Sequence, residues 1–226
     1  MRNSIEFLCL ANSYKNEHRC LAGVRLDTGG WIRPVSTRDG GALSKERYIT
    51  QSGHTPTTLD TVRVEVERPY PKYNQPENWI ITDKQWKLID TELNNQQLLS
   101  LNTALQRDGS IIFDESDKIA KNDLKNGQTV QSLTVVEPQD PTFSIKKEKD
   151  QPRVTFHFDG TEYNMPITDP KWRNAVENGS VDQLPTADQV DDDKALLLTI
   201  SLGEEYEGFC YKLVASIFTV KAEQLV

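Results

Sequence analysis

The chain opens on an alternation of apolar and polar residues that falls into three short runs. An apolar run covers Phe7 to Ala11, and a polar turn over Asn12 to His18 separates it from a second run, Arg19 to Leu26. The residues Asp27 to Gly30 then lead into Trp31 to Val35. Runs of period two, divided by short turns that contain Asn or Gly, are typical of antiparallel strands. The pattern therefore predicts a three-stranded meander over residues 7–36.

The second turn of this meander sets the register of the strands beside it. Glycine adopts positive φ without steric cost, so Thr28 to Gly30 is suited to a three-residue hairpin turn. A turn of that length pairs Leu26 with Ile32 and Arg25 with Arg33. Directly paired residues of two antiparallel strands lie on the same face of the sheet. The predicted register therefore decides which side chains meet.

One face of the meander is predicted to gather basic groups around an indole ring. This face holds Arg19, Arg25, Trp31 and Arg33, and the opposite, apolar face holds Cys20, Ala22, Val24 and Ile32. Ser13 and Lys15 belong to the preceding turn. Because guanidinium groups bind phosphates and an indole stacks on bases, the basic face is a candidate nucleic-acid site. Two alternatives stay open: arginines that only protect a strand edge, and a Trp31 ring that packs in the core.

The rest of the first half adds a loop, a strand and a helical region. Residues 39–56 are rich in Gly, Ser and Thr and predict a long loop, and Thr61 to Glu67 alternates as a strand. Thr82 to Gln85 has the form of a capping box that starts a helix, and leucines at helical spacing extend the helical region to Leu105. Ser132 to Val136 then predicts a strand that closes the first barrel.

From Pro141 onward the pattern predicts three strands, a helix and two strands. The expected strands cover residues 142–146, 153–158, 162–165, 196–200 and 210–220. The helix starts at Asp169, with Pro170 at its first position and Gly179 just past its end. A helix between the third and fourth of five strands is the order of an OB-fold barrel.

These elements together predict a mainly β protein with minor α content, built as two tandem OB-like five-stranded barrels. The expected first barrel covers residues 1–138 and includes a helical insertion over about 82–126, and the second covers 139–226. At 226 residues the chain is long enough for two such cores. It has no apolar run long enough to span a bilayer and no signal-peptide pattern, so we expect a cytoplasmic protein.

The charge is unevenly distributed along the chain. The net charge is −8, but residues 1–72 carry 11 Lys and Arg against 8 Asp and Glu, whereas the remainder carries 15 against 26. Neutralisation of phosphates is the source of non-specific affinity for nucleic acid, so the overall charge argues against generic coating of a polyanion. A polyanion site therefore belongs in the first third of the chain. The acidic remainder predicts a solvated surface or a face for a protein partner.

The sequence offers little chemistry for catalysis or for metal binding. It has no P-loop, no GxSxG or HExxH motif and no dinucleotide fingerprint, so we expect neither enzymatic activity nor a cofactor. Cys9, Cys20 and Cys210 form no CxxC pair and are expected to be reduced and buried. The three histidines lack metal-ligand spacing, and Asp191 to Asp193 lacks the spaced ligands of a calcium loop, so no metal site is predicted.

Five segments carry a resemblance to a known family. They are SYKNEHRCLAGV, GGWIRPVS, PENWII, TDPKW and SLGEEYEGFCYKLVASI. Together they resemble the prokaryotic proteins that contain a dual OB domain, over nearly the whole chain. The resemblance implies two OB folds, a nucleic-acid or nucleotide-binding role and a bacterial defence or mobile-element setting. It supplies no catalytic residues, and its matching candidates for a binding site are Ser13, Lys15, Arg19, Trp31 and Arg33.

The leading hypothesis is a binding module that recognises single-stranded nucleic acid or a nucleotide-like ligand on the first barrel. Trp31 is expected to stack on a base, and Lys15, Arg19 and Arg33 are expected to contact phosphate. The rival hypothesis is a protein-interaction subunit that docks onto a nuclease or ATPase partner through the acidic second half. A third possibility is a sensor that encloses a small modified nucleotide in a pocket at the same site.

Overall fold

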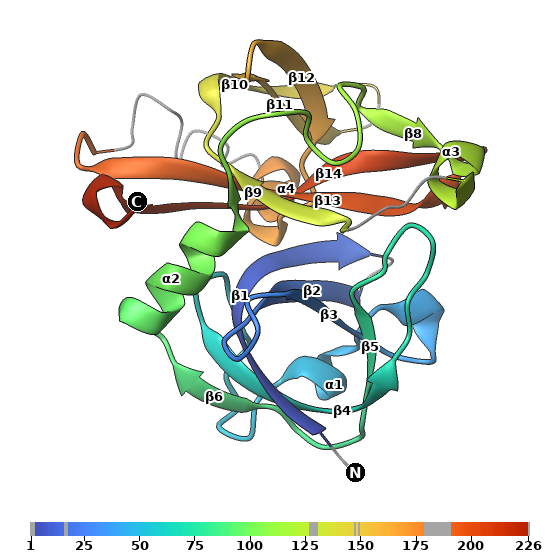
Figure 1. The fold of residues 1–226 in the computed structure, drawn as a ribbon, viewed down its shortest axis with the longest axis vertical. Helices are drawn as coiled ribbons and strands as arrows, with labels where there is room; N and C mark the ends of the chain where they lie inside the picture. Colours follow the sequence, from blue (N-terminus) through green and yellow to red (C-terminus); the bar gives the residue numbers. More distant parts are fainter. Residues whose placement is uncertain are drawn as a thin grey trace. The chain divides into compact units, whose positions relative to one another are not determined.

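The computed structural model describes residues 3–15, 18–126, 131–146, 148, 150–178 and 191–225 (Figure 1). The chain divides into two compact units, Met1–Ala104 and Leu105–Val226. Both units are mainly β, and each contains the strand arrangement of an OB-like barrel. The predicted fold class is therefore confirmed. None of the helices in the described ranges is long and apolar enough to cross a membrane.

The first unit is a closed barrel of five strands. Its elements are β1 (Asn3–Lys15), β2 (His18–Arg25), β3 (Trp31–Val35), α1 (Lys45–Tyr48), β4 (Thr61–Pro69), β5 (Asn78–Ile81), β6 (Lys87–Asp90) and α2 (Asn95–Ala104). The strands pair in the order β1-β2-β3-β5-β4, and β4 pairs back onto β1. Only the β3–β5 pair is parallel among these five strands. Closure leaves the barrel without a free edge, and β6 adds to β4 from outside.

Strand β1 makes closure possible because it pairs with two strands in turn. Its first half pairs with β4 and its second half with β2, with an irregularity between Cys9 and Ala11. Gly23 faces Cys9 at this bend, and a Cβ atom on Gly23 would lie 1.9 Å from the carbonyl oxygen of Leu8. Only glycine permits two backbones to approach so closely. The glycine of the segment RCLAGV is thus explained by the coiling of the barrel.

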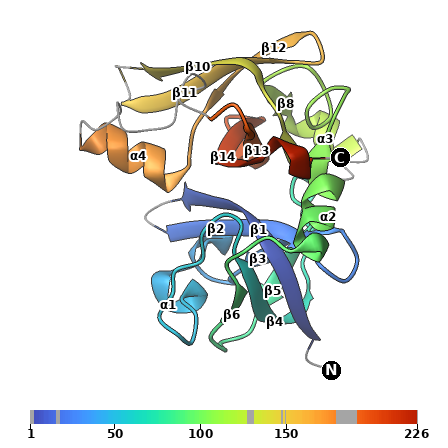
Figure 2. The same ribbon diagram turned by 90° about the vertical axis from the view of Figure 1, so that its left-hand side faces the viewer.

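The barrel interior is filled by alternate residues of its strands. Its buried core is Ile5, Phe7, Cys9, Leu21, Ile32, Leu43, Tyr48, Val62, Val64, Val66, Ile81 and Trp86. Trp86 is fully buried and meets Phe7 edge to face, with 5.9 Å between ring centroids. Helix α2 packs against β1 and β2 with Leu101 fully buried (Figures 1 and 2). The inward alternation predicted for β4 is confirmed.

The second unit repeats the same order with its first strand divided in two. Its elements are β7 (Leu105–Gln106), β8 (Lys118–Ala120), α3 (Lys121–Asn126), β9 (Leu133–Val136), β10 (Gln139–Lys146), β11 (Gln151–Phe158), β12 (Thr161–Pro166), α4 (Pro170–Glu177), β13 (Lys194–Tyr206) and β14 (Phe209–Lys221). Strand β9 pairs with β13, and β10 pairs with β11, so β9 and β10 together correspond to β1. A parallel bridge between Ile167 and Val214 joins the two sheets. This is the strand order of the first barrel.

Most elements predicted for the second half are confirmed. All five expected strands are present, and Asp159 and Gly160 form the β11–β12 turn with positive φ at both residues. Helix α4 begins at Pro170 with Asp169 as its N-cap and lies against β11 (Figure 2). Gly179, predicted just past the end of this helix, lies outside the described residues.

Two predictions for the middle of the chain are wrong. The capping box at Thr82 starts no helix, because Trp86 bridges to Thr50 and is buried in the core, and Lys87–Asp90 continues as a strand. Residues 133–136 do not close the first barrel, because they pair with β13, and β5 closes it instead. The compact units consequently divide after Ala104, whereas the sequence had placed the division after residue 138. The predicted helical leucines are confirmed only within Asn95–Ala104.

The three cysteines are free thiols. Cys9 and Cys210 are buried, as expected, and Cys20 is half-buried. Burial, reinforced by the charge of Asp60, raises the pKa of the Cys9 thiol far above its usual range. Cys9 is therefore held as an unreactive thiol of the core.

Candidate nucleic-acid interface

The β2–β3 turn is longer than the sequence suggests, and this changes the register. Val24 pairs with Trp31, and Gly23 pairs with Ile32. The turn is closed by hydrogen bonds from the Arg25 N–H to the Gly30 carbonyl, 2.9 Å, and from the Gly29 N–H to the Arg25 carbonyl, 3.0 Å. The predicted pairs of Leu26 with Ile32 and of Arg25 with Arg33 are therefore wrong.

A shift by an odd number of residues moves a strand's side chains to the other face. Ile32 enters the core together with Leu21, so Trp31 and Arg33 lie on the opposite side of the sheet from it. Arg19 and Arg25 have the parity of Leu21. The predicted single face of Arg19, Arg25, Trp31 and Arg33 is thus not formed. The observed register buries Ile32 in the barrel core.

The structure places Arg25 and Arg33 each against a carboxylate. The Arg33 side chain is only 7% exposed and forms an ion pair with Glu77, 5% exposed, at 3.0 Å. Arg25 donates from Nε and Nη2 to the two oxygens of Asp27, at 2.9 and 2.7 Å, and these hydrogen bonds lower the pKa of Asp27. The Arg25 guanidinium also lies 5.5 Å from the ring centre of Trp79. Trp31 itself is half-buried. Both arginine charges are therefore largely balanced within the unit.

The β1–β2 hairpin holds a different basic and aromatic pair. Tyr14 and Arg19 are direct partners, and the Arg19 guanidinium lies over the Tyr14 ring, 4.1 Å from its centre. Arg19 Nη1 donates to the side-chain oxygen of Asn12 at 3.4 Å. Asn12 Nδ2 in turn donates to the carbonyl of Pro56 at 2.9 Å. Among the described residues, no carboxylate forms an ion pair with Arg19.

Ser13 and Lys15 occupy the other side of the same hairpin. Ser13 pairs with Cys20, and its hydroxyl donates to the Cys20 carbonyl at 3.5 Å. Lys15 Nζ donates to the carbonyl of Gly40 at 2.7 Å. Gly40 has a φ of 61°, a conformation that glycine adopts freely and that directs this carbonyl towards the lysine. The hairpin therefore carries three of the six predicted site residues, with Arg19 on one side and Ser13 and Lys15 on the other.

Sequence reasoning missed Tyr14 and Asn12. It assigned residues 12–18 to a turn, whereas β1 continues to Lys15 and β2 already begins at His18. Once Lys15 is paired with His18, Tyr14 falls opposite Arg19 by counting alone. The signal in the sequence was the length of the polar stretch over residues 12–18, which is more than a tight turn needs. Polar residues can extend a strand beyond the barrel as readily as they form a turn.

The corresponding sheet of the second unit offers polar groups without aromatic rings. The outward side chains of β10, β11 and β12 include Thr142, Ser144, Arg153, Thr155, His157, Glu162 and Asn164. Arg153 is engaged by Asn164, with Nε 2.5 Å from the side-chain oxygen and Nη2 2.6 Å from the carbonyl. Phe143 stacks on Trp172 at 4.4 Å. The only guanidinium in this set of outward side chains, that of Arg153, is bound by Asn164 and has no aromatic ring beside it on that face, so the first unit is the better candidate for stacking on bases.

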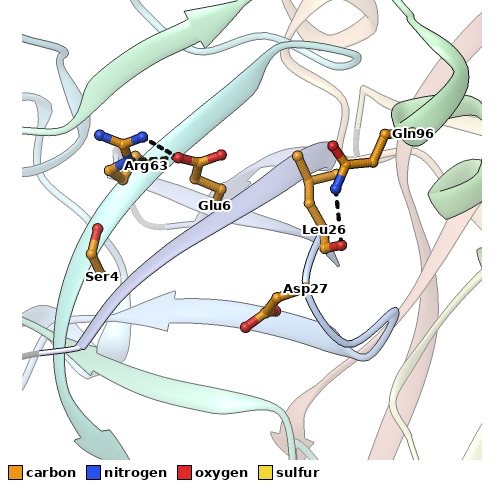
Figure 3. A pocket seen from close by; sticks show the side chains of 6 residues that line it. All are labelled: Ser4, Glu6, Leu26, Asp27, Arg63 and Gln96. Atoms are coloured by element: carbon orange, nitrogen blue, oxygen red, sulfur yellow. Dashed lines mark hydrogen bonds and ion pairs between the residues drawn. The ribbon is translucent and has the colours of Figure 1, made fainter.

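A shallow pocket of about 430 Å³ also lies on the first unit (Figure 3). It is lined by Ser4, Glu6, Leu26, Asp27, Arg63 and Gln96. Glu6 accepts two hydrogen bonds from Arg63, and Gln96 donates to the Leu26 carbonyl at 3.3 Å. Its two carboxylates repel phosphate, and none of the six predicted site residues lines it. Among the described residues no group of three His, Cys, Asp or Glu side chains is placed to hold a metal ion.

Comparison with known proteins identifies the family and gives distant likenesses in fold. A family model described as a dual OB-containing domain matches residues 5–217. No curated protein matches the chain in sequence.

Among solved structures, a tetrameric p202 HIN2 is 6% identical, with 97% of this chain and 93% of the other covered and a TM-score of 0.34. A murine DNA-binding protein bound to double-stranded DNA is 7% identical, with 98% and 100% covered and a TM-score of 0.33. A Replication Protein A heterotrimer bound to single-stranded DNA is 11% identical, with 99% and 50% covered and a TM-score of 0.38. Scores this low carry no argument about ligand or mechanism, so the functional argument rests on the family and on the hairpin.

Proposed function

The chain belongs to the dual OB-containing domain family, and from that premise we propose that it is a non-enzymatic module that binds single-stranded nucleic acid or a nucleotide-like ligand. The observation that carries the proposal is the Arg19 guanidinium 4.1 Å above the Tyr14 ring, on a hairpin that also presents Lys15. A guanidinium plane stacks on a base, and an ammonium group binds a neighbouring phosphate.

The proposed contact residues are Ser13, Tyr14, Lys15 and Arg19. Arg25 and Arg33 belong to the sequence-based candidates, but recruiting either to a phosphate breaks an ion pair with Asp27 or Glu77. For the buried Arg33 pair, that would leave Glu77 uncompensated in a nearly water-free site, which is costly. Trp31 lies on the same side of β3 as Arg33. We therefore leave Arg25, Trp31 and Arg33 out of the contact set.

Fluorescence anisotropy with labelled oligonucleotides of about 20 nucleotides tests the proposal, at salt concentrations from about 50 to about 200 mM. We expect salt-sensitive binding by the wild type and a loss of about tenfold in affinity for Arg19→Ala, since one stacked base contributes about 1–3 kcal/mol. Arg63→Ala is the matched control, because Arg63 pairs with Glu6 on β1 and β4 of the same unit. Absence of binding, or equal weakening by Arg19→Ala and Arg63→Ala, would overturn the proposal.

The rival function is a protein-interaction subunit, and the charge of the second unit favours it. Residues 105–226 carry 22 Asp and Glu against 13 Lys and Arg. Under that hypothesis, the purified chain does not bind oligonucleotides and binds a nuclease or ATPase partner through the acidic unit. The bacterial defence or mobile-element setting and the cytoplasmic location belong to the proposal in the same way, as expectations that a gene neighbourhood and a cell fractionation would test.

A further inference from the structure

The long loop between β3 and β4 is bound to the β1–β2 hairpin at two points. The backbone of Leu43 exchanges hydrogen bonds with that of Arg19, at 3.0 and 2.8 Å. Lys15 Nζ donates to the Gly40 carbonyl at 2.7 Å. These contacts fix residues 38–45 alongside the hairpin, so side chains of this segment and of the hairpin share one region of the first unit.

This segment carries two cations, Arg38 and Lys45, and both are exposed. Among the side chains that the structure describes, neither forms an ion pair with a carboxylate. Many other cations of the first unit are paired, namely Arg25 with Asp27, Arg33 with Glu77, Arg47 with Asp83, Arg63 with Glu6 and Lys84 with Glu65. An unpaired cation binds a phosphate without first giving up a salt bridge. Arg38 and Lys45 are therefore better placed to bind phosphate than the paired cations are.

Resting on the proposed function, we propose that the ligand is a single strand several nucleotides long, and that Arg38 and Lys45 bind its phosphates. One base stacks on the guanidinium of Arg19, and the backbone then follows Lys15 and the loop over residues 38–45. A base inside a duplex presents no free face for such stacking, so the site selects a single strand. We call the path from Arg19 past Lys15 to the loop over residues 38–45 the track. A mononucleotide is long enough to contact only the hairpin part of the track and makes no contact with the loop.

Two carboxylates, Asp39 within the loop and Glu46 directly after it, oppose the strand. Glu46 is exposed next to Lys45, and its pKa is lowered by hydrogen bonds from its own backbone N–H and the Ser44 side chain, and by the nearby His18 and Lys45. It is therefore ionised at neutral pH and repels phosphate. Removing its charge through Glu46→Gln should strengthen binding, whereas removing a neighbouring cation should weaken it. Partial unfolding of the variants would weaken binding in both cases, so affinity changes of opposite sign at Lys45 and Glu46 would indicate an electrostatic effect.

The experiment measures affinity for a labelled oligothymidylate of about 12 nucleotides as a function of salt, with thymidine monophosphate and a duplex of equal length as competitors. We expect Arg38→Ala and Lys45→Ala each to weaken binding about three- to tenfold and to lower the salt slope by about 0.7, the value for one phosphate contact on a single strand. Lys87→Ala is the matched control. Lys87 is an exposed lysine of strand β6 in the same unit, and it has no ion pair among the described residues.

Three results would overturn the inference while leaving the proposed function in place. The first is oligonucleotide binding whose salt slope is the same for Lys45→Ala, Arg38→Ala and Lys87→Ala. The second is competition by the mononucleotide as strong as that by the oligonucleotide, and the third is a preference for the duplex. Loss of all binding by the wild type would instead remove the proposed function itself. Stronger binding by Glu46→Gln, together with the two weakened variants, supports the track over residues 38–45.

Discussion

At the scale of single residues, Lys212 of β14 is the most unusual group in the second unit. Its side chain is completely buried. Nζ donates to the carbonyl and to the carboxylate of Asp114, at 2.5 and 3.0 Å, and lies 5.8 Å from the ring centre of Tyr163. Burial lowers the pKa of Lys212, and the Asp114 carboxylate offsets only part of this effect. Folding therefore disfavours the charged ammonium form of Lys212 relative to its neutral amine.

This lowered pKa makes stability depend on pH with a definite sign. Between the folded pKa of Lys212 and its unfolded value of about 10.5, the unfolded chain binds the proton more tightly, so the free energy of unfolding rises with pH. We expect Lys212→Met, which keeps the apolar stem, to remove this rise and to change stability at neutral pH by no more than about 1–4 kcal/mol in either direction. Urea unfolding from neutral pH to about pH 10 measures it. An unchanged pH dependence in Lys212→Met would show that another group is responsible.

At the scale of elements, closure of the first barrel depends on Gly23. A methyl group there would lie 1.9 Å from the Leu8 carbonyl oxygen and 2.7 Å from Phe7 Cδ2, so β1 and β2 would have to separate. We expect Gly23→Ala to destabilise the protein by more than about 3 kcal/mol, in the range of severe overpacking. Chemical denaturation followed by circular dichroism measures this loss. Gly30→Ala is the control, because its new Cβ would approach nothing closer than 3.6 Å, and equal stability of the two variants would contradict the closure argument.

One carboxylate, that of Asp169, joins the start of helix α4 to strand β14. Asp169 accepts from the N–H of Lys171 at 2.8 Å, as an N-cap, and from the N–H of Ile217 in β14 at 3.1 Å. We expect Asp169→Ala to cost about 2–4 kcal/mol, because it removes the cap and leaves a buried N–H without a partner. Asp169→Ser should restore part of this loss, since a shorter hydroxyl still caps the helix. Thermal unfolding compares the three proteins, and identical melting temperatures for Ala and Ser would argue that the cap contributes nothing.

Elements were predictable where local pattern and burial agree. The valines of β4, the hairpin of β11 and β12, and the Asp169–Pro170 helix start each carry their signal within a few residues. Strand β5 does not, because it is only four residues long and includes a buried asparagine, Asn78, so nothing in its pattern marks it as the closing strand. The Thr82 capping box failed for the opposite reason. Its local signal is clear, and burial of Trp86 overrides it.

The candidate site was predictable in its region but not in its geometry. The charge balance of the first third and the residues Ser13, Lys15 and Arg19 pointed to the hairpin. The face that was to unite Arg19 with Trp31 depended on the length of one turn, and a shift in register reverses a face completely. Pairing of Arg33 with Glu77 joins residues 44 positions apart. Such long-range pairs follow from the closed barrel, and the sequence pattern does not contain them.

At the scale of the whole molecule, a nucleic-acid site in the first unit must work against a net charge of −8. Long-range repulsion from the acidic half acts over about 10 Å at 0.1 M salt and about 30 Å at 0.01 M, so it matters most at low ionic strength. The acidic residues Asp191 to Asp193 are exposed, and Asp191 is paired with Lys194 at 2.6 Å. Asp192 and Asp193 therefore contribute to this field without a hydrogen-bonded cation of their own among the described residues.

The double change Asp192→Asn and Asp193→Asn tests whether this field is all that the acidic loop contributes. If the acidic loop acts only through long-range repulsion, the variant should bind a labelled single strand about twofold more tightly than the wild type at low salt. At about 0.15 M salt, where the field is screened, the two proteins should bind it equally well. Anisotropy titrations at the two ionic strengths measure the difference, with Glu223→Gln as a control of equal sign on another exposed carboxylate. A change that persists at high salt would instead mean that the loop is itself a contact surface. That result would contradict a purely long-range role of Asp192 and Asp193, because a screened field cannot change the affinity for the single strand.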